Sequence, residues 1–325
     1  MTAPSSSTTQ TAATSDPTPS GTDPSVSPSG TGPSASPVRP GRRRSSALLS
    51  GTPHLILLLW ALAVLIPLAW IVISSLKTNE EIYNSPFGLP GELRLGIYIA
   101  AWQESNIGAY FANTMIVVCG GVLLTMLLAV MTAYVMARYP FPGSRILYWL
   151  YLAGMTFPVF LAIVPLVRIV QSLGLFQTST GLVLVYAAFS LPFSIFFLTG
   201  FFRSLPTELS EAAFLDGAGH FGVFFRIMLP LARPGLVSIG VFNFLGQWNQ
   251  FLLPQVLNPQ QDESRSNFVL SQGLVALALG ENYETSPTSM AQLFAGLIIS
   301  MLPVLVLYIV FQRQVQEGLS AGALK

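Results

Sequence analysis

Few residues of this sequence carry a charge. Lys and Arg together number 15 and Asp and Glu 14, which is 9% of the 325 residues. Hydrophobic residues make up 52% of the chain and the mean hydropathy is +0.61. An ordinary soluble domain has about 25% charged residues. The shortage of charge therefore excludes such a domain and predicts that most of the chain lies in a lipid bilayer.

Cysteine and histidine are nearly absent as well. The single cysteine, Cys119, excludes an intramolecular disulfide and a cysteine metal cluster, and two histidines, His54 and His220, give no basis for a histidine metal site. The sequence contains no HExxH, GxSxG or GxxxxGK[ST] motif. We therefore expect no metal, no cofactor and no enzymatic activity in this chain.

Long apolar runs are abundant. A spanning helix needs about 20 predominantly apolar residues, because every backbone polar group in hydrocarbon must be satisfied within the segment. Six stretches meet this requirement, at roughly Leu55–Leu76, Ala109–Ala137, Ile146–Val167, Leu182–Phe202, Gly235–Leu253 and Ser289–Gln312. The predicted fold class is all-α, a polytopic membrane protein with six transmembrane helices. We expect a short turn at Arg168–Gly181, and kinks at the prolines within the spans, Pro67, Pro158, Pro165, Pro192 and Pro303.

Basic residues indicate the orientation, because Lys and Arg favour the cytoplasmic side of short loops. With the amino terminus inside, only Lys77, Arg94, Arg168 and Arg265 fall outside the cell. This predicts that both termini and the segment Glu211–Pro230 are cytoplasmic. The first 50 residues are rich in Ser, Thr, Pro and Gly, and we predict a disordered cytoplasmic tail at 1–50 followed by one transmembrane domain at 51–325.

The cytoplasmic loop at 204–230 is one of the few polar stretches between spans. Ser204 is expected to cap a helix with Pro206 and Glu208 in its first turn, and Gly217 to end it at a positive φ. A second short apolar stretch ends at Pro230. The pattern predicts two short helices joined at a glycine bend, with small alanines that let another surface approach closely. The alternative is an amphipathic loop lying along the lipid interface.

The spacing in this loop resembles the EAA motif of ABC importer permeases, EAAxxxG followed after nine residues by IxLP. The matching residues are Glu211, Ala212, Ala213, Gly217, Ile227, Leu229 and Pro230. Further stretches resemble the carbohydrate-uptake permeases related to the maltose transporter, specifically the MalG-like subunit: "SLKTNEEIYNSPFGLP", "AYVMARYPFPGSR", "FSLPF", "FNFLGQWNQFLLP" and "GLSAGALK". The sequence departs from the family at Phe214 and Leu215, where relatives often have a more polar pair, and in its long tail.

The resemblance implies a type I ABC importer permease with the MetI-like fold, in a bacterial cell membrane. Such a subunit pairs with a second, MalF-like permease, and an extracellular solute-binding protein delivers the sugar. A dimeric ATPase docks on the cytoplasmic loops, so the 204–230 loop is the expected coupling site. The resemblance implies contacts with lipid and none with nucleic acid.

Polar residues inside the spans are candidates for the substrate path, because they are costly in lipid. Asn113 lies in the second span and Asn243, Gln247, Trp248 and Asn249 in the fifth, where Asn243 and Gln247 share a helix face. Hydrogen bonding between helices is the alternative for each. A channel or secondary transporter would need no ATPase, but the spans contain essentially no ionisable residue for ion coupling. A permease for another solute, such as a polyamine or phosphate, remains the alternative function.

Overall fold

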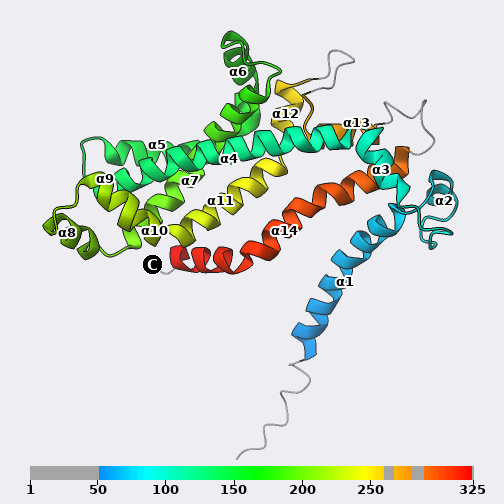
Figure 1. The fold of residues 1–325 in the computed structure, drawn as a ribbon, viewed down its shortest axis with the longest axis horizontal. Helices are drawn as coiled ribbons and strands as arrows, with labels where there is room; N and C mark the ends of the chain where they lie inside the picture. The colour runs from blue at the N-terminus through cyan, green and yellow to red at the C-terminus, as the bar shows by residue number, and fades with distance from the viewer. Residues whose placement is uncertain (1–50, 260–266, 280–288, 324–325) are drawn as a thin grey trace, which may run out of the picture. The chain divides into compact units, whose positions relative to one another are not determined.

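The computed structural model describes residues 51–259, 267–279 and 289–323, and in these ranges every regular element is a helix (Figure 1). The predicted tail at 1–50 lies outside the described residues. The helices are α1 (Gly51–Ser74), α2 (Asn79–Asn84), α3 (Gly96–Gln103), α4 (Ile107–Arg138), α5 (Ser144–Thr156), α6 (Val159–Ser172), α7 (Ser179–Ser204), α8 (Glu208–Leu215), α9 (His220–Val223), η1 (Phe224–Met228), α10 (Leu229–Leu231), α11 (Arg233–Trp248), α12 (Leu252–Leu257), α13 (Leu270–Ala278) and α14 (Ser289–Ala323).

Four helices are long and apolar enough to cross a membrane unaided: α1, α4, α7 and α14. They match the first, second, fourth and sixth predicted spans, with ends that differ by a few residues except at the carboxyl end of α14. Two pairs of shorter helices, each bent at a break, raise the number of possible crossings to six within the described ranges. The all-α fold is confirmed, and two of the six candidate crossings are bent helix pairs rather than continuous helices.

The third predicted span, Ile146–Val167, is divided into α5 and α6, whose axes differ by 104°. The break falls at Pro158, which has no N–H to continue the helix and disfavours the helical region for the residue before it. Phe157 is accordingly extended, with φ −73° and ψ 123°. The kink predicted at Pro158 is thus a full interruption. The predicted turn at Arg168–Gly181 is also shorter than expected, because α6 continues to Ser172 and α7 begins at Ser179.

The fifth predicted span, Gly235–Leu253, was placed too far along the chain. Helix α11 begins at Arg233, ends at Trp248 and is bent by 72° from the helical stretch that precedes it. A helix of 16 residues rises about 24 Å, less than the ~30 Å hydrocarbon core. The chain continues through an irregular stretch into α12. Asn249 follows the last residue of α11 as its C-cap, and its side-chain amide donates to Leu245 O at 2.8 Å.

Contacts between the helices fix their relative directions. A Cβ on Gly120 of α4 would touch Val183 near the start of α7, and Tyr134 contacts Phe202 near the end of both, so the two helices run parallel. Helix α11 is antiparallel to them, because the later residue Gln247 contacts Gly121 of α4 whereas the earlier residue Asn243 contacts Met126. Helix α14 runs against α11 in turn, with Ser238 bonded to Gln314 and Trp248 to Ser300. These directions fit the alternation that six crossings require.

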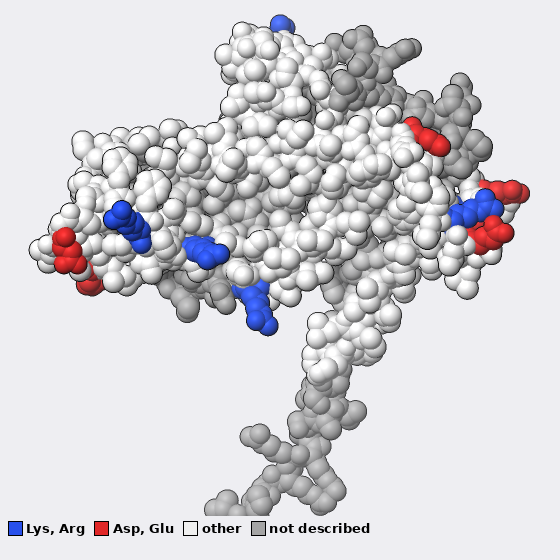
Figure 2. All heavy atoms as spheres, viewed as in Figure 1, with Lys and Arg blue, Asp and Glu red and all other residues white. Residues whose placement is uncertain are grey.

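The visible surface shows two charged ends. In Figure 2, acidic and basic side chains gather over α8–α10 at one end and over α2 and α3 at the other, while the surface along α4 and α14 between them is almost free of charge. Exposed apolar residues cover this middle zone, among them Ile116, Leu123, Leu127, Leu305, Val306 and Ile309. A band of this kind fits a lipid environment, because a water-exposed apolar surface of such extent is rare in soluble monomers.

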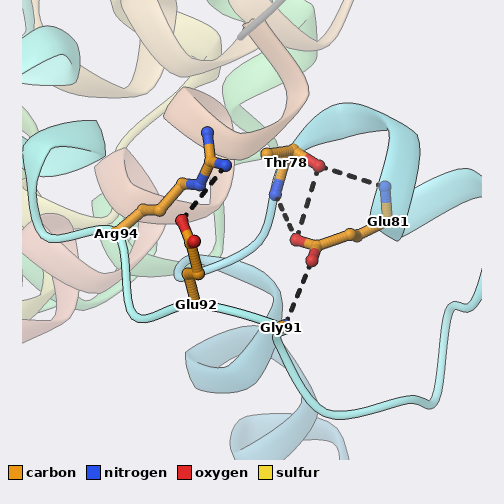
Figure 3. A network of polar contacts seen from close by, with 5 residues as sticks. All are labelled: Thr78, Glu81, Gly91, Glu92 and Arg94. Carbon is orange, nitrogen blue, oxygen red and sulfur yellow. Dashed lines mark hydrogen bonds and ion pairs between the residues drawn. The ribbon is translucent and has the colours of Figure 1, made fainter.

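Hydrogen bonds fasten the segment that joins α1 to α4. Lys77 is fully buried, and its Nζ donates to Ser85 O at 3.0 Å and Pro86 O at 3.1 Å. Thr78 and Glu81 cap α2 reciprocally, and Gly91 N also donates to Glu81 at 3.1 Å (Figure 3). Hydrogen bonds from the Thr78 and Gly91 N–H groups hold the pKa of Glu81 below its ordinary value. The segment between α1 and α4 is therefore held in a defined conformation by hydrogen bonds.

Candidate functional site

The 204–230 segment lies at the end of the molecule where α4 and α7 finish (Figure 1). The expected cap at Ser204 is wrong: Ser204 is the last residue of α7, and its hydroxyl donates to Phe201 O at 2.7 Å. Leu205 is extended before Pro206, which disfavours the helical region for the residue before it. Helix α8 instead begins at Glu208 after Thr207, with Glu208 and Glu211 in its first turn, where the helix dipole favours acidic side chains.

The glycine bend is confirmed. Gly217 has φ +83°, the left-handed region that side chains with a Cβ rarely adopt. The Gly217 and Ala218 N–H groups donate to Phe214 O at 3.0 Å and Ala213 O at 2.9 Å, which satisfies the last carbonyls of α8. A Cβ at position 217 would meet nothing within 4 Å. The requirement for glycine here is therefore conformational and not steric.

The two alanines of the motif differ in exposure. Ala213 is only 8% exposed and packs into a cluster formed by α4, α7, η1 and α11, so the expectation that it offers an approach surface is wrong. Ala212 and Glu211 are exposed. Beside them Leu215 is 89% exposed and Phe221 is 77% exposed, although both are large and apolar. Two large apolar side chains are thus exposed at an end of the molecule that is otherwise charged.

Helix α8 presents a negatively charged surface. Glu208, Glu211 and Asp216 are exposed, and within the described residues none of them pairs with a basic side chain. Figure 2 shows the corresponding acidic patch over α8. The exposed face of α8 is therefore acidic.

The stretch after the bend is not the simple helix that was predicted. Helix α9 passes into a π-helical turn, η1, and then into α10, so helical structure continues past Pro230 to Leu231. Of the motif residues, Ile227 and Leu229 are partly buried, and Pro230 is exposed near the start of α10. Phe224 and Met228 of η1 are buried in the same cluster as Ala213. The second half of the motif therefore anchors the segment to the helices.

A cavity of about 370 Å³ lies between α7 and α11, beside the α5–α6 break. Its lining includes Val159, the first residue of α6 after the break, Gln250 in the irregular stretch after α11, and Leu253 of α12. Irregular backbone at membrane depth is tolerated where it is buried in protein or lines a polar cavity. The volume is within the usual range of about 300–1,000 Å³ for small-molecule sites.

Asn243 and Gln247 both line this cavity, as their shared helix face predicts. Both are 5% exposed. Asn243 Nδ2 donates to Ser194 Oγ at 2.8 Å and Gln247 Nε2 to Ser190 Oγ at 3.0 Å, so the bonds between helices that we considered as the alternative are present. Gln247 Oε1, however, has no partner among the described residues and lies so close to Gly121 that a methyl group there would collide with it. One buried acceptor beside the cavity is left unpaired, which is costly.

The other candidates do not join this cavity. Asn113 donates from Nδ2 to Phe268 O at 3.0 Å and so fastens the stretch before α13. Trp248 and Asn249 line a different cavity of about 280 Å³, toward α13 and α14. Trp248 Nε1 donates to Ser300 O at 3.1 Å, and its ring stacks on Phe244. The five candidates thus fall into a pair that shares one cavity and three residues elsewhere.

Sequence reasoning missed the aromatic wall of the 370 Å³ cavity. Four rings line it, Tyr186, Phe189 and Phe193 from α7 and Phe242 from α11, together with the hydroxyl of Ser190. The signal was present, because "FSLPF" places Phe189, Ser190 and Phe193 on one face of a span at helical spacing. Only the packing of α7 against α11 shows that these rings face the two amides.

Comparisons with known proteins agree with this architecture. Residues 121–320 match the family model described as "Binding-protein-dependent transport system inner membrane component". The chain belongs to this family. The resemblance to ABC importer permeases inferred from the EAA motif is thereby confirmed, and the chain is a multi-pass membrane component of such a system.

Individual relatives show which transport systems the chain is similar to. The chain is 49% identical over 272 residues to the diacetylchitobiose uptake system permease protein NgcG of Streptomyces coelicolor, covering 84% of this chain and 88% of that protein. It is 33% identical to the trehalose transport system permease protein SugB of Mycobacterium tuberculosis, covering 80% and 92%. A bacterial ABC transporter involved in the import of alginate has a chain of the same fold, with a TM-score of 0.73, 22% identity and coverage of 85% and 99%.

Proposed function

We propose that this permease is a subunit of an ATP-driven importer that carries a sugar or oligosaccharide across a bacterial cell membrane. Diacetylchitobiose, the sugar named for the relative that is 49% identical, is the first candidate substrate. The observation that carries the proposal is helix α8, which directly precedes the Gly217 bend. Its residues Glu211, Ala212 and Leu215 are exposed. Such a helix is suited to dock on a separate ATPase.

The proposed division of labour needs partners. A second, MalF-like permease would complete the pathway, a dimeric ATPase would bind the 204–230 segment, and an extracellular solute-binding protein would deliver the sugar. The acidic patch on α8 supports a partner with basic or N–H groups. The bias of basic residues supports an orientation with this segment and both termini in the cytoplasm.

The 370 Å³ cavity supports a neutral, hydroxyl-rich substrate. Its polar groups, Ser190, Asn243, Gln247 and Gln250, are uncharged donors and acceptors, and its rings can stack on the apolar C–H faces of a sugar. A polyamine path would be expected to carry carboxylates, and a phosphate path cationic groups, whereas no ionisable carboxylate or base lines this cavity among the described residues. The cavity therefore favours a sugar over the alternative solutes.

Uptake of labelled diacetylchitobiose tests the proposal. Deleting the chain is expected to abolish ATP-dependent uptake, and the wild-type chain to restore it. Asn243→Leu removes an amide from the cavity wall while Ser194 keeps its own bond to Ser190 O. This variant is expected to lower uptake about tenfold, since losing a polar contact in a buried site costs about 1–3 kcal/mol, and to change the preference among related sugars.

Asn249→Leu is the matched control, because Asn249 is an exposed amide directly after α11 whose side chain donates to Leu245 O of the preceding turn. Its uptake should stay near wild type. If the deletion leaves the uptake of every tested sugar unchanged, the proposed function is wrong. If only Asn243→Leu is without effect, the amide is a packing residue.

A further inference from the structure

We propose that Arg138 and Tyr139, where α4 ends, are positioning residues that fasten the 204–230 segment to α4 on both sides of α8. Through these two attachments a movement of α8 is passed to α4 and not only along the chain to α7 and α11. The proposal rests on the proposed function of the segment in coupling. It adds a specific mechanical connection and the residues that make it.

The first attachment is a charge-assisted hydrogen bond. Arg138 Nη2 donates to Leu205 O at 2.7 Å, and Leu205 is the residue at which the chain leaves α7 toward α8. The same nitrogen lies 3.9 Å from Met228 Sδ in η1, where the segment returns. Arg138 therefore contacts the 204–230 segment both where it leaves α7 and where it returns toward α11.

The second attachment lies beyond the Gly217 bend. Tyr139 Oη and His220 Nδ1, in the first residue of α9, are 2.8 Å apart and share a hydrogen bond. The His220 ring also meets the Tyr139 ring edge-on at 5.4 Å and the Phe214 ring of α8 at 5.1 Å. A continuous series of contacts thus leads from α8 through Phe214 and His220 to Tyr139 of α4.

Helix α4 connects these attachments to the cavity. It is one uninterrupted helix of 32 residues without an internal proline. Near its end Tyr134 packs on Phe224 of η1, with ring centres 4.8 Å apart. Further along, Met126 Sδ lies 3.7 Å from Asn243 Nδ2, and Gly121 lies against Gln247 Oε1. One helix therefore touches the 204–230 segment at one end and both cavity amides in its middle.

The test separates this connection from docking itself. The assembled transporter, isolated through a tag on this chain and placed in lipid vesicles, is assayed for ATP hydrolysis with and without its solute-binding protein loaded with diacetylchitobiose. Arg138→Met and Tyr139→Phe each remove one attachment while keeping most of the side-chain volume. Arg145→Met and Tyr148→Phe are matched controls, because Arg145 is exposed and the Tyr148 ring keeps its contact with Arg203.

Both variants are expected to keep the ATPase bound and its unstimulated rate unchanged. The stimulation by loaded binding protein should fall about threefold for Tyr139→Phe and about tenfold for Arg138→Met, in line with the loss of a neutral and of a charged hydrogen bond. Arg138→Lys retains one donor and should restore part of the stimulation. Both controls should match wild type.

Two results would overturn the proposal. Unchanged stimulation in both variants would mean that α4 does not carry the signal, and loss of the ATPase from the complex would mean that these residues only fold the segment. Ala212→Arg in the same assay tests the proposed function separately: it alters the exposed face of α8 and neither attachment. If Ala212→Arg loses the ATPase while Arg138→Met and Tyr139→Phe behave as wild type, the docking role stands and only the connection through α4 fails.

Discussion

The Ala212→Arg variant is expected to reach the membrane in normal amounts and to lose at least about tenfold in sugar uptake, because residues at the centre of an interface contribute most of its binding energy. Ala212 is exposed on α8 between Glu211 and the buried Ala213, so its replacement leaves the fold of this chain unstrained. A long cationic side chain there would hold the ATPase away from the helix. Co-isolation of the ATPase with this chain and uptake of labelled sugar measure the two losses.

Two further variants separate docking from folding. Ala212→Ser keeps the side chain small and should behave as wild type. Ala213→Arg introduces a charge into the cluster where Ala213 packs with Phe224 and Met228, so it should disturb the segment itself and lower the amount of chain recovered. If Ala212→Arg retains full ATPase association and full uptake, α8 is not the docking surface.

The Gly217→Val variant is expected to lose coupling through backbone strain alone. Gly217 has φ +83°, and a β-branched residue there costs about 1–3 kcal/mol, yet a Cβ at this position meets no neighbouring atom within 4 Å. The strain should tilt α8 relative to α9 and reduce uptake about tenfold. The measurement is uptake together with ATP hydrolysis stimulated by the loaded binding protein.

Gly217→Asn is the matched control, because asparagine tolerates the left-handed region far better than valine. It adds a side chain at the same open position and should keep most of the uptake. If both variants lose uptake equally, the bend requires the absence of a side chain at position 217 and not the positive φ. Full uptake for Val would show that the bend has no part in coupling.

The continuous spans were predictable from sequence because α4 and α7 are long, apolar and uninterrupted. The interruptions at Pro158 and after Trp248 were not predictable, since hydropathy averages over the residues at which a helix stops. Pro158 was visible in the sequence, but a proline within a span is compatible with a kink as well as with the 104° interruption that is observed. The end of α11 at Trp248 had no such marker.

The motif residues of the 204–230 segment were predictable, and their orientation was not. Spacing alone places Ala212 and Ala213 side by side, and only the packing of α8 against η1 and α4 decides that Ala213 is buried. His220 carried no signal in the sequence as a contact of Tyr139, because the two residues come from different loops. The same holds for the cavity, where α7 contributes rings opposite the amides of α11.

Cross-linking from α8 tests directly whether this chain meets an ATPase through the 204–230 segment. In a Cys119→Ser chain, Leu215→Cys places a thiol on α8 at a position that is 89% exposed, and Leu93→Cys places one at a position 74% exposed in the stretch between α2 and α3. After assembly in cells, a bifunctional thiol reagent should join the ATPase to this chain through Leu215→Cys and not through Leu93→Cys. A cross-link to the ATPase from Leu93→Cys, with none from Leu215→Cys, would contradict both the docking role of the segment and its cytoplasmic location.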